Sequence, residues 1–134
     1  MTLIAWDPNF LVGVEPFDRQ HRELFALLNQ LNESMRHGAE PTERILLLSR
    51  LLESAELHFN DEERALARTD YPDLDRHHLQ HNQLLTEAVT FQRMIDRSEG
   101  AIPLPLMVFL RDWLSEHILE TDKGCGEYLS RGVA

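Results

Sequence analysis

The segment Leu48-Ser-Arg-Leu-Leu-Glu-Ser-Ala-Glu-Leu-His-Phe-Asn-Asp-Glu62 decides the fold class. Its apolar residues recur at Leu48, Leu51 and Ala55, and the same three- and four-residue spacing continues through His58 to Glu62. Residues at this spacing share one face of an α-helix. The segment therefore predicts an amphipathic helix whose buried face ends in an imidazole and a carboxylate.

Three other segments show the same helical spacing of apolar residues. The first lies between Asp18, its expected N-cap, and His37; another runs from Leu74 to about Ser98; the last follows Pro105. The connections between the four segments are short, so neighbouring helices run antiparallel. The sequence predicts an all-α protein, an antiparallel up-down-up-down four-helix bundle.

The chain is expected to form a single domain over residues 1–134, because its 134 residues are enough to bury one core. Residues 1–17 mix prolines and a glycine with aromatic residues, which predicts an ordered N-terminal arm packed on the bundle of residues 18–131. Gly124 and Gly126 are expected to loosen the end of the fourth helix.

Composition excludes several kinds of partner. The net charge of −10 argues against nucleic acid and anionic membranes, since both are bound through basic surfaces. No apolar run is long enough to span a membrane, and the N-terminus lacks the pattern of a signal peptide. The single cysteine, Cys125, allows no internal disulfide and suits a reducing compartment, so we expect a cytoplasmic protein.

Histidines and carboxylates gather on the predicted inward faces. His77 and His81 lie four residues apart on the third helix, while the first and fourth helices contribute one histidine each. Neutral imidazoles and carboxylates are ligands of transition metals, and burying them unpaired would cost several kcal/mol each. The sequence therefore predicts a metal site formed by His21, His58, Glu62, His77, His81, His117 and Asp122.

Asp122 does not fit an undistorted helix. It follows His117 by five residues, which places it about 140° around the helix axis and off the inward face. We expect either a one-residue widening of the helix between His117 and Asp122 or unwinding toward Gly124.

Seven ligands are too many for tetrahedral zinc or for a mononuclear iron site with three protein ligands. If Glu62 and Asp122 bridge two octahedral ions that also share an oxo or hydroxo group, the site is one bond short of complete. That open position would suit a small molecule. No Glu-x-x-His pair of the ferritin-like type occurs, and fewer anionic ligands favour reversible O₂ binding over its activation.

The remaining candidates have simpler interpretations. His37 lies at a helix C-terminus, where a cation is favoured, and His78 lies about 100° away from the ligand face. Cys125 is expected to be an incidental packed thiol. The acidic residues around Glu62 are expected to form solvated faces. Five apolar residues flank the ligand positions and are expected to pack in the core and keep the open position dry: Leu24, Phe59, Trp113, Leu114 and Ile118.

The ligand candidates and their neighbours form short sequence motifs that are spread over nearly the whole chain. The motifs are Ile4-Ala-Trp6-Asp, Val12-Gly-Val14, Phe17-Asp-Arg-Gln-His21, His58-Phe-Asn-Asp-Glu62-Glu, Tyr71-Pro, His77, His81, Trp113-Leu-x-x-His117-Ile118 and Thr121-Asp122-Lys. In this set the chain resembles the hemerythrin family, specifically the single-domain bacteriohemerythrins. It departs from them at Gly124-Cys125-Gly126, where relatives commonly carry Lys and an aromatic residue.

The resemblance implies two iron ions with a bridging oxo or hydroxo group, and O₂ as ligand. His77, His81 and His117 would hold the six-coordinate iron, His21 and His58 the five-coordinate iron, and Glu62 and Asp122 would bridge. The O₂ pocket would be lined by Leu24, Phe59, Trp113, Leu114 and Ile118.

The function that follows is reversible dioxygen binding for storage or delivery, without enzymatic turnover. Two alternatives stay open. One is an oxygen or redox sensor that acts through a protein partner, and the other is peroxidatic or nitric oxide chemistry at the same irons. An oxygen carrier would pass its ligand to an oxygen-consuming protein, whereas a sensor would contact a signalling protein.

Overall fold

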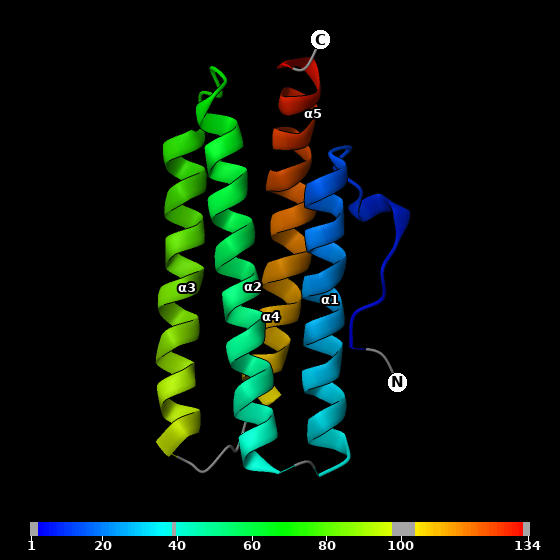
Figure 1. The fold of residues 1–134 in the computed structure, drawn as a ribbon, viewed down its shortest axis with the longest axis vertical. Coiled ribbons are helices and arrows are strands. Elements are labelled where there is room, and N and C mark those ends of the chain that lie inside the picture. The colour runs from blue at the N-terminus through cyan, green and yellow to red at the C-terminus, as the bar shows by residue number, and fades with distance from the viewer. Residues whose placement is uncertain (1–2, 39, 98–103, 133–134) are drawn as a thin grey trace.

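Four helical columns lie side by side with alternating chain direction in the computed structural model, which describes residues 3–38, 40–97 and 104–132 (Figure 1). The first three columns are α1 (Glu15–Arg36), α2 (Pro41–Ala67) and α3 (Leu74–Arg97). The fourth is continuous and consists of α4 (Leu104–Glu116), the π-helical segment η2 (His117–Asp122) and α5 (Lys123–Gly132). The described residues contain no strand. The predicted antiparallel four-helix bundle is confirmed.

Helix ends follow the expected turn chemistry. Gly38 has φ of 66° directly after the last turn of α1, a left-handed conformation that glycine adopts without steric cost. Pro41 then occupies the first position of α2, where its missing N–H has no helical partner to lose. The predicted turn between Thr69 and Asp73 separates α2 from α3. The predicted connection from Ser98 to Pro103 lies outside the described residues.

The expected role of Asp18 is wrong. Helix α1 begins earlier, at Glu15, and has no side-chain cap. Pro16 in its first turn is compatible with this start, since the N–H that it lacks would have no helical partner there. Asp18 is instead buried inside the helix, and its Oδ1 accepts the backbone N–H of Val12 at 2.8 Å. The carboxylate thus attaches the N-terminal arm to α1.

The arm of residues 3–14 runs along the outside of α1 (Figure 1) and is held at both ends. Near its start, Ile4 exchanges two hydrogen bonds with the amide of Asn29, at 3.0 and 2.8 Å. Farther along, Trp6 and Phe10 pack on Phe25 with ring centroids 5.2 and 4.9 Å away. The predicted ordered arm is confirmed over its described residues.

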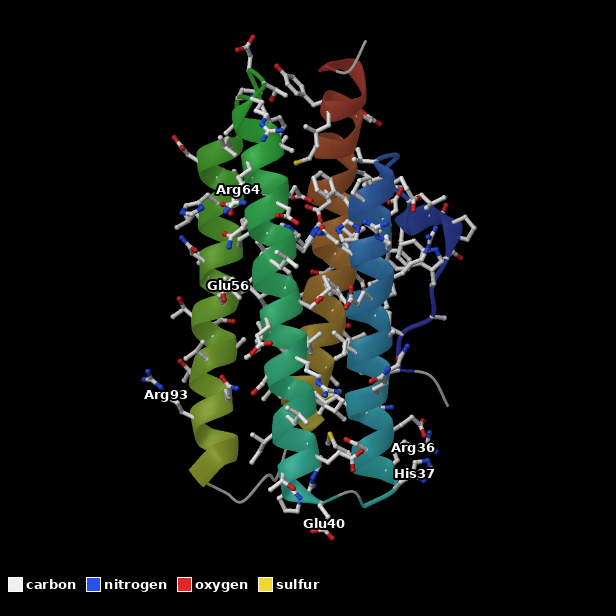
Figure 2. All side chains as sticks on the ribbon, viewed as in Figure 1. Arg36, His37, Glu40, Glu56, Arg64 and Arg93 are labelled. Carbon is white, nitrogen blue, oxygen red and sulfur yellow. The ribbon has the colours of Figure 1, made fainter. Side chains whose placement is uncertain are left out.

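The core lies between the four columns and is built mostly from leucine. Polar side chains such as Arg93, Glu40 and His37 point away from it (Figure 2). None of the helices, over the part of the chain that the structure describes, is long and apolar enough to cross a membrane. The most deeply buried leucines are Leu24, Leu28, Leu31, Leu48 and Leu66.

The expected loosening around Gly124 and Gly126 does not occur. Both residues lie within the regular helix α5. Gly126 is buried against the arm, and a Cβ there would lie 2.0 Å from the carbonyl oxygen of Val12. The glycine allows α5 and the arm to approach each other closely, so tertiary packing overrides the low helix propensity of glycine.

Candidate metal centre

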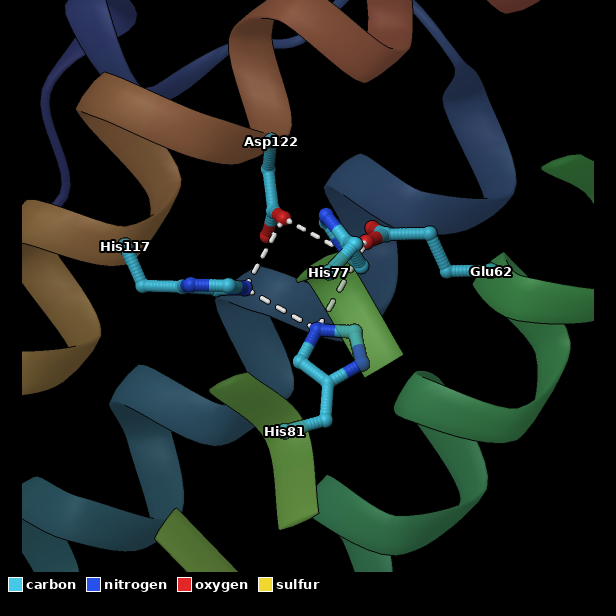
Figure 3. A group of neighbouring side chains, drawn as sticks. All are labelled: Glu62, His77, His81, His117 and Asp122. Carbon is cyan, nitrogen blue, oxygen red and sulfur yellow. Dashed lines mark hydrogen bonds and ion pairs between the residues drawn. The ribbon is translucent and has the colours of Figure 1, made fainter. Parts of the chain in front are cut away.

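All seven predicted ligands come together in the bundle interior, and each is at most 7% exposed. Their donor atoms form two overlapping groups, and within each group the atoms lie within 4.8 Å of one another. One group is Glu62, His77, His81, His117 and Asp122, drawn in Figure 3. The other is His21, His58, Glu62 and Asp122.

Glu62 presents a different oxygen to each group. Its Oε1 contacts Nε2 of His77 and lies 3.8 Å from Nε2 of His81. Its Oε2 lies 3.3 Å from Nε2 of His58, one helical turn earlier on α2. The carboxylate therefore lies between the two sets of histidines.

Asp122 is arranged in the same way from the opposite side of the site. Its Oδ1 lies 3.1 Å from Nε2 of His117 and 3.5 Å from Nε2 of His77, contacts that Figure 3 shows converging on the carboxylate. Its Oδ2 lies 3.1 Å from Nε2 of His21 and 3.8 Å from Nε2 of His58. Both carboxylates can thus contact two cations at once.

The segment η2 makes the position of Asp122 possible. Residues His117–Asp122 form a π-helix, whose wider turns bring residues five apart onto one face. Of the two predicted distortions, the widening is the one that the structure contains. The helix does not unwind toward Gly124, because α5 continues without a break.

The arrangement of donor atoms fits cations. Nε2 of His21 lies 2.8 Å from Nε2 of His58, and the Nε2 atoms of His81 and His117 are 2.9 Å apart. Each pair can share at most one proton, whereas a cation could accept the lone pairs of both nitrogens. Both carboxylate oxygens of Asp122 are buried, and the imidazole nitrogens 3.1 Å from them do not meet hydrogen-bond geometry. A cation in each group would satisfy these atoms.

Protonation states within the centre are strongly perturbed. Burial would lower the pKa of His58, but Asp122 and Glu62 raise that pKa to about 9. Burial likewise opposes the charge on His77, yet Cys125 and Glu62 raise its pKa to about 10. For His81, burial and the neighbouring histidines together lower the pKa to about 2. The site therefore holds proton charge beside its carboxylates when no metal is bound.

Two residues that contact ligand histidines were missed by the sequence reasoning. Oε1 of Gln20 lies 2.7 Å from Nδ1 of His58, while the amide nitrogen of Gln20 donates to Asp61 at 2.9 Å. Sγ of Cys125 lies 3.3 Å from Nδ1 of His77. Cys125 is buried, as expected of a packed thiol, but its contact with a ligand is not incidental to the site. Its spacing of three residues from Asp122 places it on the same side of the helix as that ligand, but does not tell which residue it faces.

The interpretation of the acidic residues as solvated faces is wrong for Glu63. Its side chain is 16% exposed, contacts Nδ1 of His78 and has Oε2 3.9 Å from Nδ1 of His81. His78 itself is exposed, and so is His37, which pairs with Glu33 at 2.9 Å. Neither of these two histidines belongs to the metal-binding groups, as expected.

An apolar cavity of about 30 Å³ lies in the core. Leu24, Phe59, Trp113 and Leu114, all predicted pocket residues, line it together with other apolar side chains. The ring of Phe59 stacks on that of His81 with centroids 3.9 Å apart, and Trp113 stacks on His117 at 4.5 Å. The cavity wall therefore contacts two candidate ligands. Ile118 is fully buried but does not line this cavity.

Together the fold and the site define a four-helix bundle with a buried centre of histidines and carboxylates suited to cations. Residues 12–129 match the family model of the hemerythrin HHE cation binding domain. The chain therefore belongs to the hemerythrin family.

Relatives support this assignment over almost the full length. The chain is 30% identical to a bacteriohemerythrin of Clostridium acetobutylicum, covering 90% of this chain and 97% of that protein. It is 29% identical to a bacteriohemerythrin of Methylococcus capsulatus, covering 97% and 99%. A crystal structure of wild-type hemerythrin is 28% identical and superposes with a TM-score of 0.89, covering 96% of this chain and 99% of that one.

Proposed function

We propose that this protein binds dioxygen reversibly at a pair of iron ions, for oxygen storage or delivery. The observation that carries the proposal is the sharing of Glu62 and Asp122 by two unequal groups of histidines. His77, His81 and His117 would hold one ion and His21 and His58 the other, with both carboxylates bridging. The ion with two histidines has one protein ligand fewer, which leaves it a position for a small ligand.

Iron would supply the electrons and the binding site for dioxygen. The protein's own residues position the ligands and keep water away from them. Phe59 and Trp113 stack on His81 and His117 and restrict the rotation of both rings. The cavity beside them is lined entirely by apolar residues, so an uncharged diatomic gas is a better occupant than a polar substrate. No acidic or basic side chain lines it to assist turnover.

The first test is anaerobic reconstitution with Fe(II), followed by visible spectra as air is admitted and then purged. About two irons per chain and a reversible spectral change would support the proposal. An immediate and irreversible change would contradict it. That outcome would favour a redox sensor that contacts a signalling protein, or peroxidatic or nitric oxide chemistry.

A substitution tests the assignment of the second ion. In His58→Ala the group with two histidines loses one of them, so we expect reversible oxygen binding to disappear while some iron is retained. The matched control is His37→Ala, which removes an exposed histidine of the α1 terminus. Reversible binding by the His58 variant would refute the assignment.

The supply of dioxygen also suggests where the protein acts. An oxygen store needs an oxygen-consuming protein to receive its ligand, and the reduced buried thiol of Cys125 suits the cytoplasm. Oxygen consumption by membranes or extracts with and without the loaded protein would measure such a transfer.

A further inference from the structure

We propose that Cys125 is a positioning residue of the metal centre, whose sulfur accepts the Nδ1–H of His77 and holds Nε2 of that ring toward the metal. The inference rests on the di-iron function proposed above and concerns the group with three histidines.

The geometry of His77 leaves its two nitrogens with distinct tasks. Nε2 faces the interior, in contact with Glu62 and 3.5 Å from Oδ1 of Asp122. A neutral imidazole carries one proton, and a metal on Nε2 leaves that proton on Nδ1. The Nδ1–H points at Sγ of Cys125, 3.3 Å away. Sulfur thus occupies the place that a carboxylate or carbonyl oxygen usually takes behind a ligand histidine.

The thiol is firmly placed. Cys125 is 1% exposed, and it follows Asp122 by three residues, so one turn of helix carries both the carboxylate and the sulfur to the same side. Its neighbour Gly126 packs closely on Val12, which limits movement of α5. The sulfur is therefore held in position when His77 binds a cation.

Tyr71 is a second hydrogen-bonding neighbour of the Cys125 sulfur. Burial and a hydrogen bond with Cys125 raise the pKa of Tyr71, and its ring meets His77 edge-on with centroids 6.5 Å apart. The raised pKa means that the protonated phenol is favoured, so the Tyr71 O–H donates to the sulfur, which can therefore accept from both His77 and Tyr71. The sulfur is thus an acceptor for two neighbouring groups.

Two substitutions separate hydrogen bonding from packing. Cys125→Val fills a similar volume but cannot accept the proton, whereas Cys125→Ser keeps an acceptor at the same place. Leu129→Val is the matched control, because it trims a buried side chain one turn later on α5 without removing a contact to a ligand.

The readouts are the release of Fe(II) to a chelator under anaerobic conditions and proton NMR of the iron-loaded protein with ¹⁵N-labelled histidine. We expect Cys125→Val to release one of its two irons about 10- to 100-fold faster, as for other residues that support a ligand histidine. The Nδ1–H signal of His77 should move in the same variant. Cys125→Ser and Leu129→Val should stay close to the unmodified protein in both measurements.

Unchanged iron release together with an unmoved Nδ1–H signal in Cys125→Val would overturn the inference, since the thiol would then only fill space. If that variant does not fold, the NMR spectrum of the unmodified, iron-loaded protein still tests the inference. Its spectrum must place the N–H of His77 on Nδ1, and an Nε2–H would overturn the inference. Failure of the unmodified protein to bind two irons would instead refute the proposed function.

Discussion

At Gly126 the helix α5 and the arm are so close that an added Cβ would lie 2.0 Å from the carbonyl oxygen of Val12. We expect Gly126→Ala to displace the arm or the helix and to lower the free energy of unfolding by about 1–3 kcal/mol, the usual cost of overpacking. Urea unfolding monitored by circular dichroism would measure the loss.

Gly124 supplies the matched control two residues earlier. A Cβ there meets nothing within 4 Å, and the residue is exposed. Alanine has the higher helix propensity, so Gly124→Ala should stabilise the protein by about 0.5–1 kcal/mol. Equal effects of the two substitutions would mean that propensity, and not the contact with Val12, decides at both positions.

Individual residues mark the limits of prediction from the sequence. The seven ligand candidates were found because spacing along a single helix determines which side chains share a face. Gln20 and Cys125 were missed because their partners, His58 and His77, lie on other helices. Such contacts depend on how neighbouring helices are rotated, which no single helix records. Gly126 was misjudged for the same reason.

Among the elements, η2 is the one that the regular spacing of apolar residues could not predict. A chemical requirement, a carboxylate five residues after His117, led to the expectation of a distorted helix between His117 and Asp122. The start of α1 was placed too late because Asp18 was interpreted as its N-cap, while Pro16 is compatible with the earlier start at Glu15. Site chemistry thus predicted a helix irregularity that local propensity did not.

Because η2 is π-helical, we expect deletion of one of its residues and insertion of one residue to affect iron binding differently. A π-helical turn contains one residue more than the corresponding α-helical turn. Deleting the exposed Leu119 should restore a regular helix and still leave the carboxylate four residues after His117, on the same face. We expect this variant to fold and to bind about two irons per chain, measured by iron analysis after reconstitution.

Inserting one alanine after Leu119 is the opposite change and should rotate Asp122 and all of α5 by about 100° relative to His117. Iron uptake should then fall, and the arm should lose its contact with Gly126. If deletion and insertion reduce iron uptake equally, the expectation is wrong. The metal centre would then need the π-helical backbone of η2 itself, and not only a carboxylate on the same face of the helix as His117.

For the molecule as a whole, metal binding and proton binding compete for the same nitrogens. The raised pKa values of His58, about 9, and of His77, about 10, mean that both rings are protonated at pH 7 without metal. His81, with a pKa lowered to about 2, is already neutral and has no proton to give up. Any cation in the centre must displace protons from the first two rings.

We therefore expect metal loading at pH 7 to release about two protons per chain from His58 and His77. The release should diminish as the pH rises through 9 and then 10, where both rings lose their protons in the metal-free protein as well. Metal affinity should increase over the same range. Calorimetry of Fe(II) binding in buffers of different ionisation enthalpy would count the protons, and a value near zero at pH 7 would contradict the expectation.

The two tryptophans of the chain lie in different surroundings, with a consequence for spectroscopy. The indole of Trp113 is parallel to the ring of His117 at 4.5 Å, whereas Trp6 packs in the arm against Phe10 and Phe25. A coloured iron centre would quench the emission of Trp113 by energy transfer. Trp6 fluorescence would change when the arm detaches. With Trp6 replaced by phenylalanine, the emission of Trp113 would follow metal occupancy; with Trp113 replaced, the emission of Trp6 in the metal-free protein would follow arm docking, in both cases without an attached dye.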